Sequence, residues 1–387
     1  MQVSPFRAFI AAFAALAFAV VPDAGRAADP YEIAVVLPLT GPGAFVGKTH
    51  QTTLGLFEAA INRDGGIKGQ PIKFAFYDDQ TSPQVAVQLA NQILAKKPAV
   101  VLGSSLSAMC RSMMPLFQNG PVHMCLSPAV YPAKDAYTFS NSVSSKNLLI
   151  ATLRYFRERG WTRIARITTT DASGQDGATA IAEALALPEN SGLKLVDSEQ
   201  FAPTDVSVAA QVATMKAAAP QAIIAWISGT PFGTALHAIH DAGIDVPVVS
   251  STANMIDAQL KQYSSFMVKQ LYFPGLNYAV GIAPTPQVRA AQRIYTDSLK
   301  AAGVTTDLQS GFVWDPALIV IEALRHVGTS ATAAQLHDYI EGLHDFAGIT
   351  GVYDFRSGDQ RGVGVNDVAM MRWDGERSAF GAAPKAR

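Results

Sequence analysis

Small polar residues follow several strand-like segments, and they are the first candidates for chemistry. Loop 103–108 lies between a buried apolar run and a helix that Ser107 opens. Loops 126–131, 168–176 and 228–230 occupy similar places later in the chain. Backbone N–H groups and hydroxyls between a strand end and a helix start can bind a carboxylate. A single serine in such a loop is more often a helix cap, but four loops of this kind together indicate a ligand site.

Residues for catalysis or metal binding do not gather in a recognisable pattern. Glycine loop 41–47 follows a strand, but its third glycine stands one residue late for a dinucleotide fingerprint, and Pro42 lacks an N–H group for phosphate. Neither a GxxxxGK[ST] motif nor a GxSxG motif occurs. His237 and His240 beside Asp241 stand late in a helix, where histidines suit the negative end of the dipole. We therefore expect no enzyme, no cofactor and no metal site.

The composition and the first residues indicate an exported protein with two domains. The chain has 387 residues, of which 49% are hydrophobic and 16% charged. A formal net charge of −1 without lysine or arginine runs excludes the nucleic-acid-binding class. Arg7, the apolar run 8–21 and the small residues before Ala28 are typical of a secretory signal, and the run is too short for the roughly 20 residues of a spanning helix. We expect residues 1–27 to be a cleaved signal peptide and the protein to act in the periplasm.

The cysteine count bears on the redox state of the chain. Cys110 and Cys125 are its two cysteines. In an oxidising compartment an even number of cysteines favours a disulfide, which would stabilise a loop of this size by about 3 kcal/mol. Two reduced, buried thiols are the alternative. A metal site would need more ligands than these two residues supply.

Strand-like and helix-like segments alternate in two successive series of similar size. The predicted strands of the two series lie at 33–37, 72–77, 100–102 and 122–126, and then at 163–167, 193–201, 222–227 and 246–249. Helices are expected between them, one of them at 176–187, and later at 286–301, 315–327 and 333–343. The tail segments 351–355 and 368–373 resemble a hairpin. This alternation of strands and helices predicts an α/β protein with two doubly wound parallel-sheet lobes. Such sheets bind ligands at the carboxyl ends of their strands.

Five segments, in this order, resemble the Leu/Ile/Val-binding protein family of type I periplasmic binding proteins. They are 33–42 (IAVVLPLTGP), 62–69 (NRDGGIKG), 77–79 (YDD), 127–129 (SPA) and 311–314 (GFVW). The resemblance covers essentially the whole chain after the signal segment. It implies two α/β lobes joined by three hinge crossovers near 143–145, 276–277 and 349–351. The N-terminal lobe would then hold residues 28–144 and 278–349, and the C-terminal lobe residues 145–277 and 350–387.

The same resemblance implies a ligand site between the lobes. Ser107 would receive a ligand carboxylate, helped by the backbone of the second polar loop, and Phe312 would form a wall. The residues expected around the ligand are Phe45, Ser107, Ala108, Ala129, Tyr131 and Phe312 from one lobe, and Ser173, Gln175, Asp176, Thr230 and Asn254 from the other. No metal ligand or catalytic residue is among them.

Departures from the family pattern bear on the ligand. Amino-acid binders of the family hold the α-ammonium with a threonine in the second loop and an acid in the second lobe. The matching places here are Val130-Tyr131, without a threonine, and 251–253, without an acid. Burying an ammonium without a carboxylate partner costs several kcal/mol. Segments 125–128 and 171–176 resemble instead the subgroup that imports aromatic carboxylates of the benzoate or phenylpropenoate type.

The function that follows is capture of a small carboxylate and its delivery to an ABC transporter permease by a monomeric, non-enzymatic protein that closes about a hinge. Three alternatives stay open. They are a binding protein for a branched-chain or other aliphatic acid or amino acid, a ligand-sensing receptor module, and an exported α/β enzyme.

Overall fold

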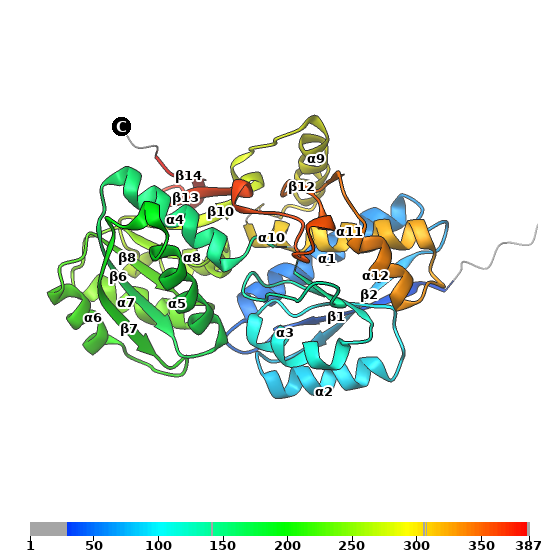
Figure 1. Ribbon diagram of the computed structural model, residues 1–387, viewed down its shortest axis with the longest axis horizontal. Coiled ribbons are helices and arrows are strands. Elements are labelled where there is room, and N and C mark those ends of the chain that lie inside the picture. The colour runs from blue at the N-terminus through cyan, green and yellow to red at the C-terminus, as the bar shows by residue number, and fades with distance from the viewer. Residues whose placement is uncertain (1–28, 141, 305, 307, 385–387) are drawn as a thin grey trace, which may run out of the picture.

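The structure, a computed structural model, describes residues 29–140, 142–304, 306 and 308–384. The predicted signal peptide, residues 1–27, lies outside these residues. Within them, no helix combines the length and the apolar character needed to cross a bilayer. Figure 1 shows two lobes side by side, with the chain passing between them more than once.

The first lobe is built on a five-stranded sheet in which all pairings are parallel. Its strands, in spatial order, are β2 (Ile72–Asp78), β1 (Tyr31–Leu37), β3 (Val100–Gly103), β4 (Val122–Cys125) and β5 (Thr138–Ser140). Strand β1 is apolar on both faces, as a parallel strand covered by helices must be. Ile33, Val35 and Leu37 pack with Leu54 and Phe57, whereas Ala34 and Val36 join a separate cluster.

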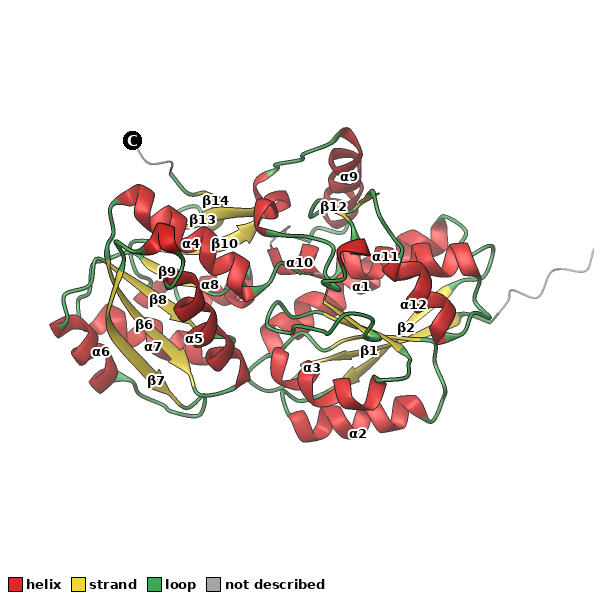
Figure 2. Cartoon of the chain, viewed as in Figure 1, coloured by secondary structure: helices red, strands yellow, loops and turns green. Residues whose placement is uncertain are grey.

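Helices cover both faces of this sheet (Figure 2). Met109 and Phe117 pack on the face that includes Val36 and Val101, and Leu54 and Phe57 pack on the other. The helices of the first lobe are α1 (Ala44–Arg63), α2 (Pro83–Leu94), α3 (Ser107–Met113), α9 (Pro286–Ala301), α10 (Leu308–Phe312), α11 (Trp314–Val327) and α12 (Ala333–Glu341).

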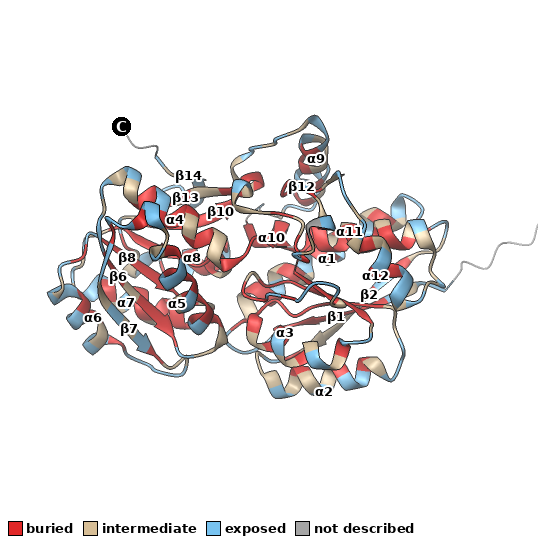
Figure 3. Cartoon of the chain, in the orientation of Figure 1, coloured by how far each residue is buried: buried red, intermediate tan, exposed pale blue. Residues whose placement is uncertain are grey.

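The second lobe contains a seven-stranded sheet. Five of its strands pair in parallel, namely β10 (Leu271–Leu276), β9 (Val248–Ser250), β8 (Ala222–Trp226), β6 (Arg163–Thr169) and β7 (Lys194–Phe201). Strands β13 (Val368–Asp374) and β14 (Ala379–Ala382) extend it with antiparallel pairing. The flanking helices are α4 (Ser145–Arg159), α5 (Ala172–Leu185), α6 (Ala209–Ala217), α7 (Pro231–Asp241) and α8 (Asp257–Gln262). Figure 3 shows inner strands such as β8 and β10 buried, and the outer helix faces exposed, whereas the edge strands β7 and β14 are largely exposed or intermediate.

The doubly wound α/β architecture is confirmed, and the sequence of strands explains the crossings between lobes. The first sheet takes strands up to Ser140, the second takes strands from Arg163 to Leu276, α9 to α12 return to the first lobe, and β13 joins the second sheet. The chain therefore crosses three times. The division at residues 144, 277 and 349 stays a prediction.

Two local predictions were wrong. The tail hairpin does not form, because β12 (Val352–Tyr353) pairs with β11 (Phe346–Ala347), whereas β13 pairs with β10 and β14. Helix α5 begins at Ala172 and not at 176, because the Asp171 side chain caps it by accepting from the N–H group of Gly174 at 2.9 Å. Ser173, Gln175 and Asp176 therefore lie on the first turns of a helix.

Candidate functional site

Two serines meet where strand-end segments of the two lobes face each other. Ser107 is the first residue of α3, and Ser173 lies in the first turn of α5. Both are buried, and their hydroxyl oxygens are 2.9 Å apart. The structure thus brings these two predicted site residues together across the lobes.

Close packing of α5 on its own sheet sets the position of Ser173. At Gly174 a Cβ atom would overlap the carbonyl oxygen of Thr169, and at Gly177 it would overlap the ring of Trp226. Since Thr169 and Trp226 are the last residues of β6 and β8, the first turns of α5 lie directly against two strand ends. This contact places one face of α5 at the edge of the sheet that points toward the first lobe.

An arginine and an aspartate form a second link between the lobes. Arg111 Nη2 of α3 lies 3.4 Å from Asp176 Oδ1 of α5 and donates to the Ala129 carbonyl at 2.6 Å. Burial raises the pKa of Asp176, and the Ser145 hydroxyl and the charge of Arg111 oppose that rise. Within the described part of the chain, no hydrogen bond of ordinary geometry reaches the buried Oδ2 of Asp176.

A pocket of about 470 Å³ opens beside this ion pair. Its size falls in the range of small-molecule sites. Arg111 and Lys146 contribute positive charge, Asp176 and Glu183 negative charge, and Lys146 Nζ lies 2.9 Å from Glu183 Oε2. Residues from both lobes line it, and they are Arg111, Tyr131, Lys146, Gln175, Asp176, Thr179, Ala180 and Glu183. Three predicted site residues are therefore neighbours in one pocket.

The second polar loop, 127–131, is held by an arginine that sequence reasoning missed. Arg361 is 5% exposed and donates to the carbonyls of Pro128 (3.1 Å) and Val130. Its guanidinium carbon lies 4.9 Å from the ring centre of Tyr131. Burial lowers the pKa of Arg361 to about 10, so the side chain is charged at neutral pH. No spacing in the sequence pointed to Arg361, because the bonded residues are more than 200 positions away.

A buried histidine network forms a third link between the lobes. His50 Nδ1 lies 2.7 Å from Ser105 Oγ, and His50 Nε2 lies 3.0 Å from Gln309 Oε1. The Gln309 amide donates to the Thr252 carbonyl of the second lobe. Burial lowers the pKa of His50 to about 4, so the ring is neutral at neutral pH. Predicted wall residue Phe312 is buried and stacks on His50 with ring centres 6.4 Å apart.

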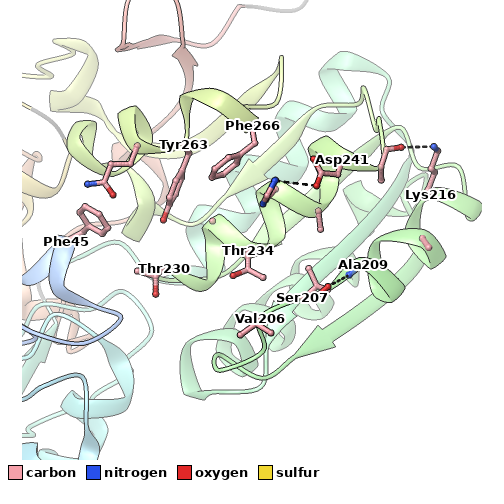
Figure 4. A pocket seen from close by; sticks show the side chains of 17 residues that line it. Phe45, Val206, Ser207, Ala209, Lys216, Thr230, Thr234, Asp241, Tyr263 and Phe266 are labelled. Atoms are coloured by element: carbon pink, nitrogen blue, oxygen red, sulfur yellow. Dashed lines mark hydrogen bonds and ion pairs between the residues drawn. The ribbon is translucent and has the colours of Figure 1, made fainter.

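Phe45 and Thr230 lie away from that pocket, in a groove of about 880 Å³. Figure 4 shows Phe45 close to Tyr263 at one end of the groove, with Phe266 and Asp241 farther along it. The Thr230 N–H group donates to the carbonyl of Pro42 at 3.2 Å, which again joins the lobes. These two predicted residues therefore mark a different part of the interlobe boundary.

The remaining predicted residues have mainly local partners. The Asn254 amide donates to the Ile227 carbonyl at 2.7 Å and accepts from the Gly229 N–H group at 3.2 Å, so it is engaged inside its own lobe. Gln175 donates to the Thr170 carbonyl at 2.8 Å. Ala108 packs against a buried cluster of the first lobe. Their contacts with a ligand stay predictions.

Cys110 and Cys125 form the predicted disulfide, and the alternative of two reduced thiols is wrong. The bridge joins α3 to the end of β4, so it ties together the elements that carry Ser107 and loop 127–131. Among the described residues, no group of three or more histidine, cysteine or acidic side chains is arranged to hold a metal ion. His237 and His240 are exposed.

The fold and the interlobe contacts define a two-lobed α/β binding protein. Residues 30–379 match a family model described as periplasmic binding protein, and the chain belongs to that family. The leucine-, isoleucine-, valine-, threonine- and alanine-binding protein of Pseudomonas aeruginosa is 30% identical over 120 residues, which are 31% of this chain and 32% of that protein. The chain spans less than two thirds of the length of the curated relatives it matches, with 60% for a Leu/Ile/Val-binding protein homolog of Brucella melitensis.

Solved structures confirm the fold over nearly the whole chain. An extracellular ligand-binding receptor from Rhodopseudomonas palustris HaA2 superposes with a TM-score of 0.81 at 21% identity, covering 92% of this chain and 100% of that one. An ABC-transporter solute-binding protein from R. palustris in complex with benzoate gives a TM-score of 0.76 at 16% identity, covering 92% and 96%. At these identities the likeness establishes the shared fold.

Proposed function

We propose that this protein is an extracytoplasmic solute-binding protein that captures a small carboxylate, of the benzoate or phenylpropenoate type, and delivers it to an ABC transporter permease. The observation that carries the proposal is the pocket of about 470 Å³ whose walls come from both lobes. A ligand held there contacts both lobes at once, so its binding favours the closed arrangement. Binding is thereby coupled to a shape that a permease can recognise.

The charges at the pocket support a carboxylate. Arg111 and Lys146 line it, and the buried charge of Arg361 lies behind the Tyr131 ring. An arginine fork is suited to a carboxylate through paired hydrogen bonds. The Ser107 and Ser173 hydroxyls belong to the same two helices as Arg111 and Asp176 and meet across the interlobe boundary, where they are further donors.

Support for an aromatic acid comes from Tyr131. This ring is 49% exposed although it lines the pocket, so one face is available to pack against a ligand ring. Burial of a ring contributes roughly 25 cal/mol per Å² of apolar area removed from water. The R. palustris protein in complex with benzoate is a precedent for this ligand class on the same fold.

A second candidate ligand is a free amino acid, and Asp176 favours it. Residues 251–253 contain no acid for an ammonium group, but the buried Asp176 carboxylate of the second lobe lies at the pocket. An ammonium near its Oδ2 would have a charged partner. The named ligands of the P. aeruginosa relative belong to this class.

Calorimetric titration separates the two candidates. Purified protein is titrated with benzoate, 3-phenylpropenoate, 3-methylbutanoate and leucine, and each compound is recovered afterwards to test for turnover. The proposal predicts that an aromatic acid binds most tightly and is recovered unchanged. Tight binding of leucine with weak binding of both aromatic acids would overturn the ligand class, and chemical conversion would overturn the binding-protein function.

The Asp176→Asn variant makes the distinction sharper. If the ligand is a carboxylic acid without an ammonium group, removing this carboxylate leaves affinity unchanged or raises it, because a nearby negative charge is lost. If the ligand is an amino acid, affinity falls by a factor on the order of 100. Asp338→Asn, at an exposed position on α12, is the matched control and leaves both ligands unaffected.

A further inference from the structure

Arg361 is a buried cation that reaches the first lobe from the segment preceding β13. Besides the two carbonyls of loop 127–131, it donates through Nη1 to Ser140 Oγ at 3.1 Å and to the Ser142 carbonyl at 2.6 Å. The side chain therefore joins two loops of the first lobe that follow β4 and β5. The described residues of these loops belong to no helix or strand.

All four hydrogen-bond acceptors of the guanidinium are neutral. In the described part of the chain, no carboxylate lies within ion-pair distance of Arg361, and Asp359 and Asp176 act on it only at longer range. A buried charge without an opposite partner is unfavourable, and a nearby anion relieves that cost. The structure therefore retains a positive charge on the first-lobe side of the site that no carboxylate of the described residues contacts directly.

The same bonds orient the backbone of the site loop. The carbonyls of Pro128 and Val130 are bound by Arg361, and the carbonyl between them, of Ala129, is bound by Arg111. Three consecutive carbonyl oxygens are thus engaged by arginines. No hydrogen bond among the described residues uses the N–H group of Val130 or Tyr131, so both donors stay available.

We propose that Arg361 is a positioning residue that fixes loop 127–131 and gives the ligand site its preference for an anion. The preference for an anion rests on the proposed function, whereas the positioning of the loop does not. The two parts are separable because a lysine retains the charge but cannot reproduce the planar fork that spans four acceptors. Both variants Arg361→Gln and Arg361→Lys therefore test the positioning of the loop, whereas their comparison tests the preference for an anion.

The positioning half is tested without a ligand. Hydrogen exchange is measured by mass spectrometry on the wild type, both variants and Arg356→Gln, an exposed control in the same segment. We expect exchange within 127–145 to rise about tenfold in both Arg361 variants, because Ser140 N–H bonds to the Gln360 carbonyl and Ser145 N–H to the Pro128 carbonyl. Peptides from 146–276 should not change in either Arg361 variant, and Arg356→Gln should match the wild type within 127–145. Unchanged exchange in 127–145 overturns the positioning role.

The anion half is tested with benzoate and its uncharged analogue benzamide. The wild type should prefer benzoate, and Arg361→Gln should reduce the ratio of the two affinities by about tenfold. Arg361→Lys should weaken both ligands but keep the ratio within about threefold of the wild type. A merely structural role would lower both affinities equally in both variants, and that result overturns the charge role.

The outcomes also separate this inference from the proposed ligand class. If the wild type binds neither probe, the aromatic-acid proposal and the anion preference both fail, but the exchange data still decide the positioning role. If Arg361→Gln does not fold, the exchange test is made on Arg361→Lys. For this variant we expect faster exchange within 127–145 together with a benzoate-to-benzamide affinity ratio close to that of the wild type.

Discussion

Replacing Asp79 with asparagine should stabilise the protein at neutral pH. Asp79 is fully buried at the end of β2, where Oδ2 accepts from the Ser104 hydroxyl at 2.6 Å and Oδ1 accepts from the Thr81 N–H group at 2.9 Å. Burial raises the pKa of Asp79 from 3.8 to about 6, against the opposing effect of these two hydrogen bonds. The folded protein therefore disfavours the charged form of Asp79.

The size of the effect follows from that pKa. A rise from 3.8 to about 6 corresponds to about 3 kcal/mol of differential stability between the two protonation states. Because the folded pKa is raised, the contribution of Asp79 to stability is fully present below pH 3.8 and is lost as the pH rises through 6. An asparagine stays neutral at every pH, and its amide can still accept from Thr81 and donate to Ser104 Oγ.

Urea denaturation at several values between pH 4 and pH 7.5 measures this difference. The unfolding free energy of Asp79→Asn minus that of the wild type should rise from near zero to about 2–3 kcal/mol over this range. Asp78 is the matched control. Burial acts to raise its pKa, but hydrogen bonds from Thr40, Gln80 and Leu39 outweigh burial and lower it. Asp78→Asn should therefore destabilise the protein above pH 4. A difference for Asp79→Asn that is constant with pH, or negative at pH 7.5, refutes the reasoning.

Three further variants test the contacts between the lobes and the Cys110–Cys125 disulfide. Ser173→Ala removes the hydrogen bond with Ser107 and should shift the unliganded protein toward an open form by about 1 kcal/mol. X-ray scattering should then show a larger radius of gyration, and an unchanged radius would count against an interlobe role for this bond. Gly229→Ala should open the lobes further and weaken ligand binding about tenfold. Its φ is 77°, and an added methyl group would lie 2.5 Å from the Pro42 carbonyl oxygen of the other lobe. Full affinity of this variant would contradict the expectation. Replacing both cysteines with alanine should lower the unfolding free energy by about 3 kcal/mol in urea, and an unchanged midpoint would show that the bridge adds no stability.

Much of the fold could be predicted because its signals are local. Helix α9 begins and ends where the sequence predicts, since Thr285 accepts from the Val288 N–H group and Pro286 stands at the first helical position. Strands such as β3 and β8 are short apolar runs that parallel sheets require. Alternation predicted the tail strand β13 but not its partners, because the period of a strand shows which face is buried and not which strand lies beside it.

The site was predicted less completely, because its decisive contacts join distant parts of the chain. The polar loops supplied Ser107 and Ser173, which face each other across the lobes, and Asp176, which pairs with Arg111 of the first lobe. His50 and Arg361 were missed, since each acts through residues far along the sequence and has no flanking motif. Asn254 shows the opposite case, in which a polar residue at a strand end is occupied inside its own lobe.

The contacts between the lobes define what a ligand must supply. A neutral hydrogen bond such as Ser107–Ser173 or Thr230–Pro42 contributes about 1 kcal/mol, and the Arg111–Asp176 pair contributes little more, because 42% of the Arg111 side chain is exposed. A carboxylate at Ser107 must displace Ser173 from it, so that hydrogen bond is exchanged and not gained. A ligand shifts the lobes only by the difference in its affinity for the two arrangements. For the aromatic acid that we propose as ligand, that difference would come from ring burial against Tyr131 and from relief of the charge of Arg361, and one molecule that contains both a ring and an anion supplies both.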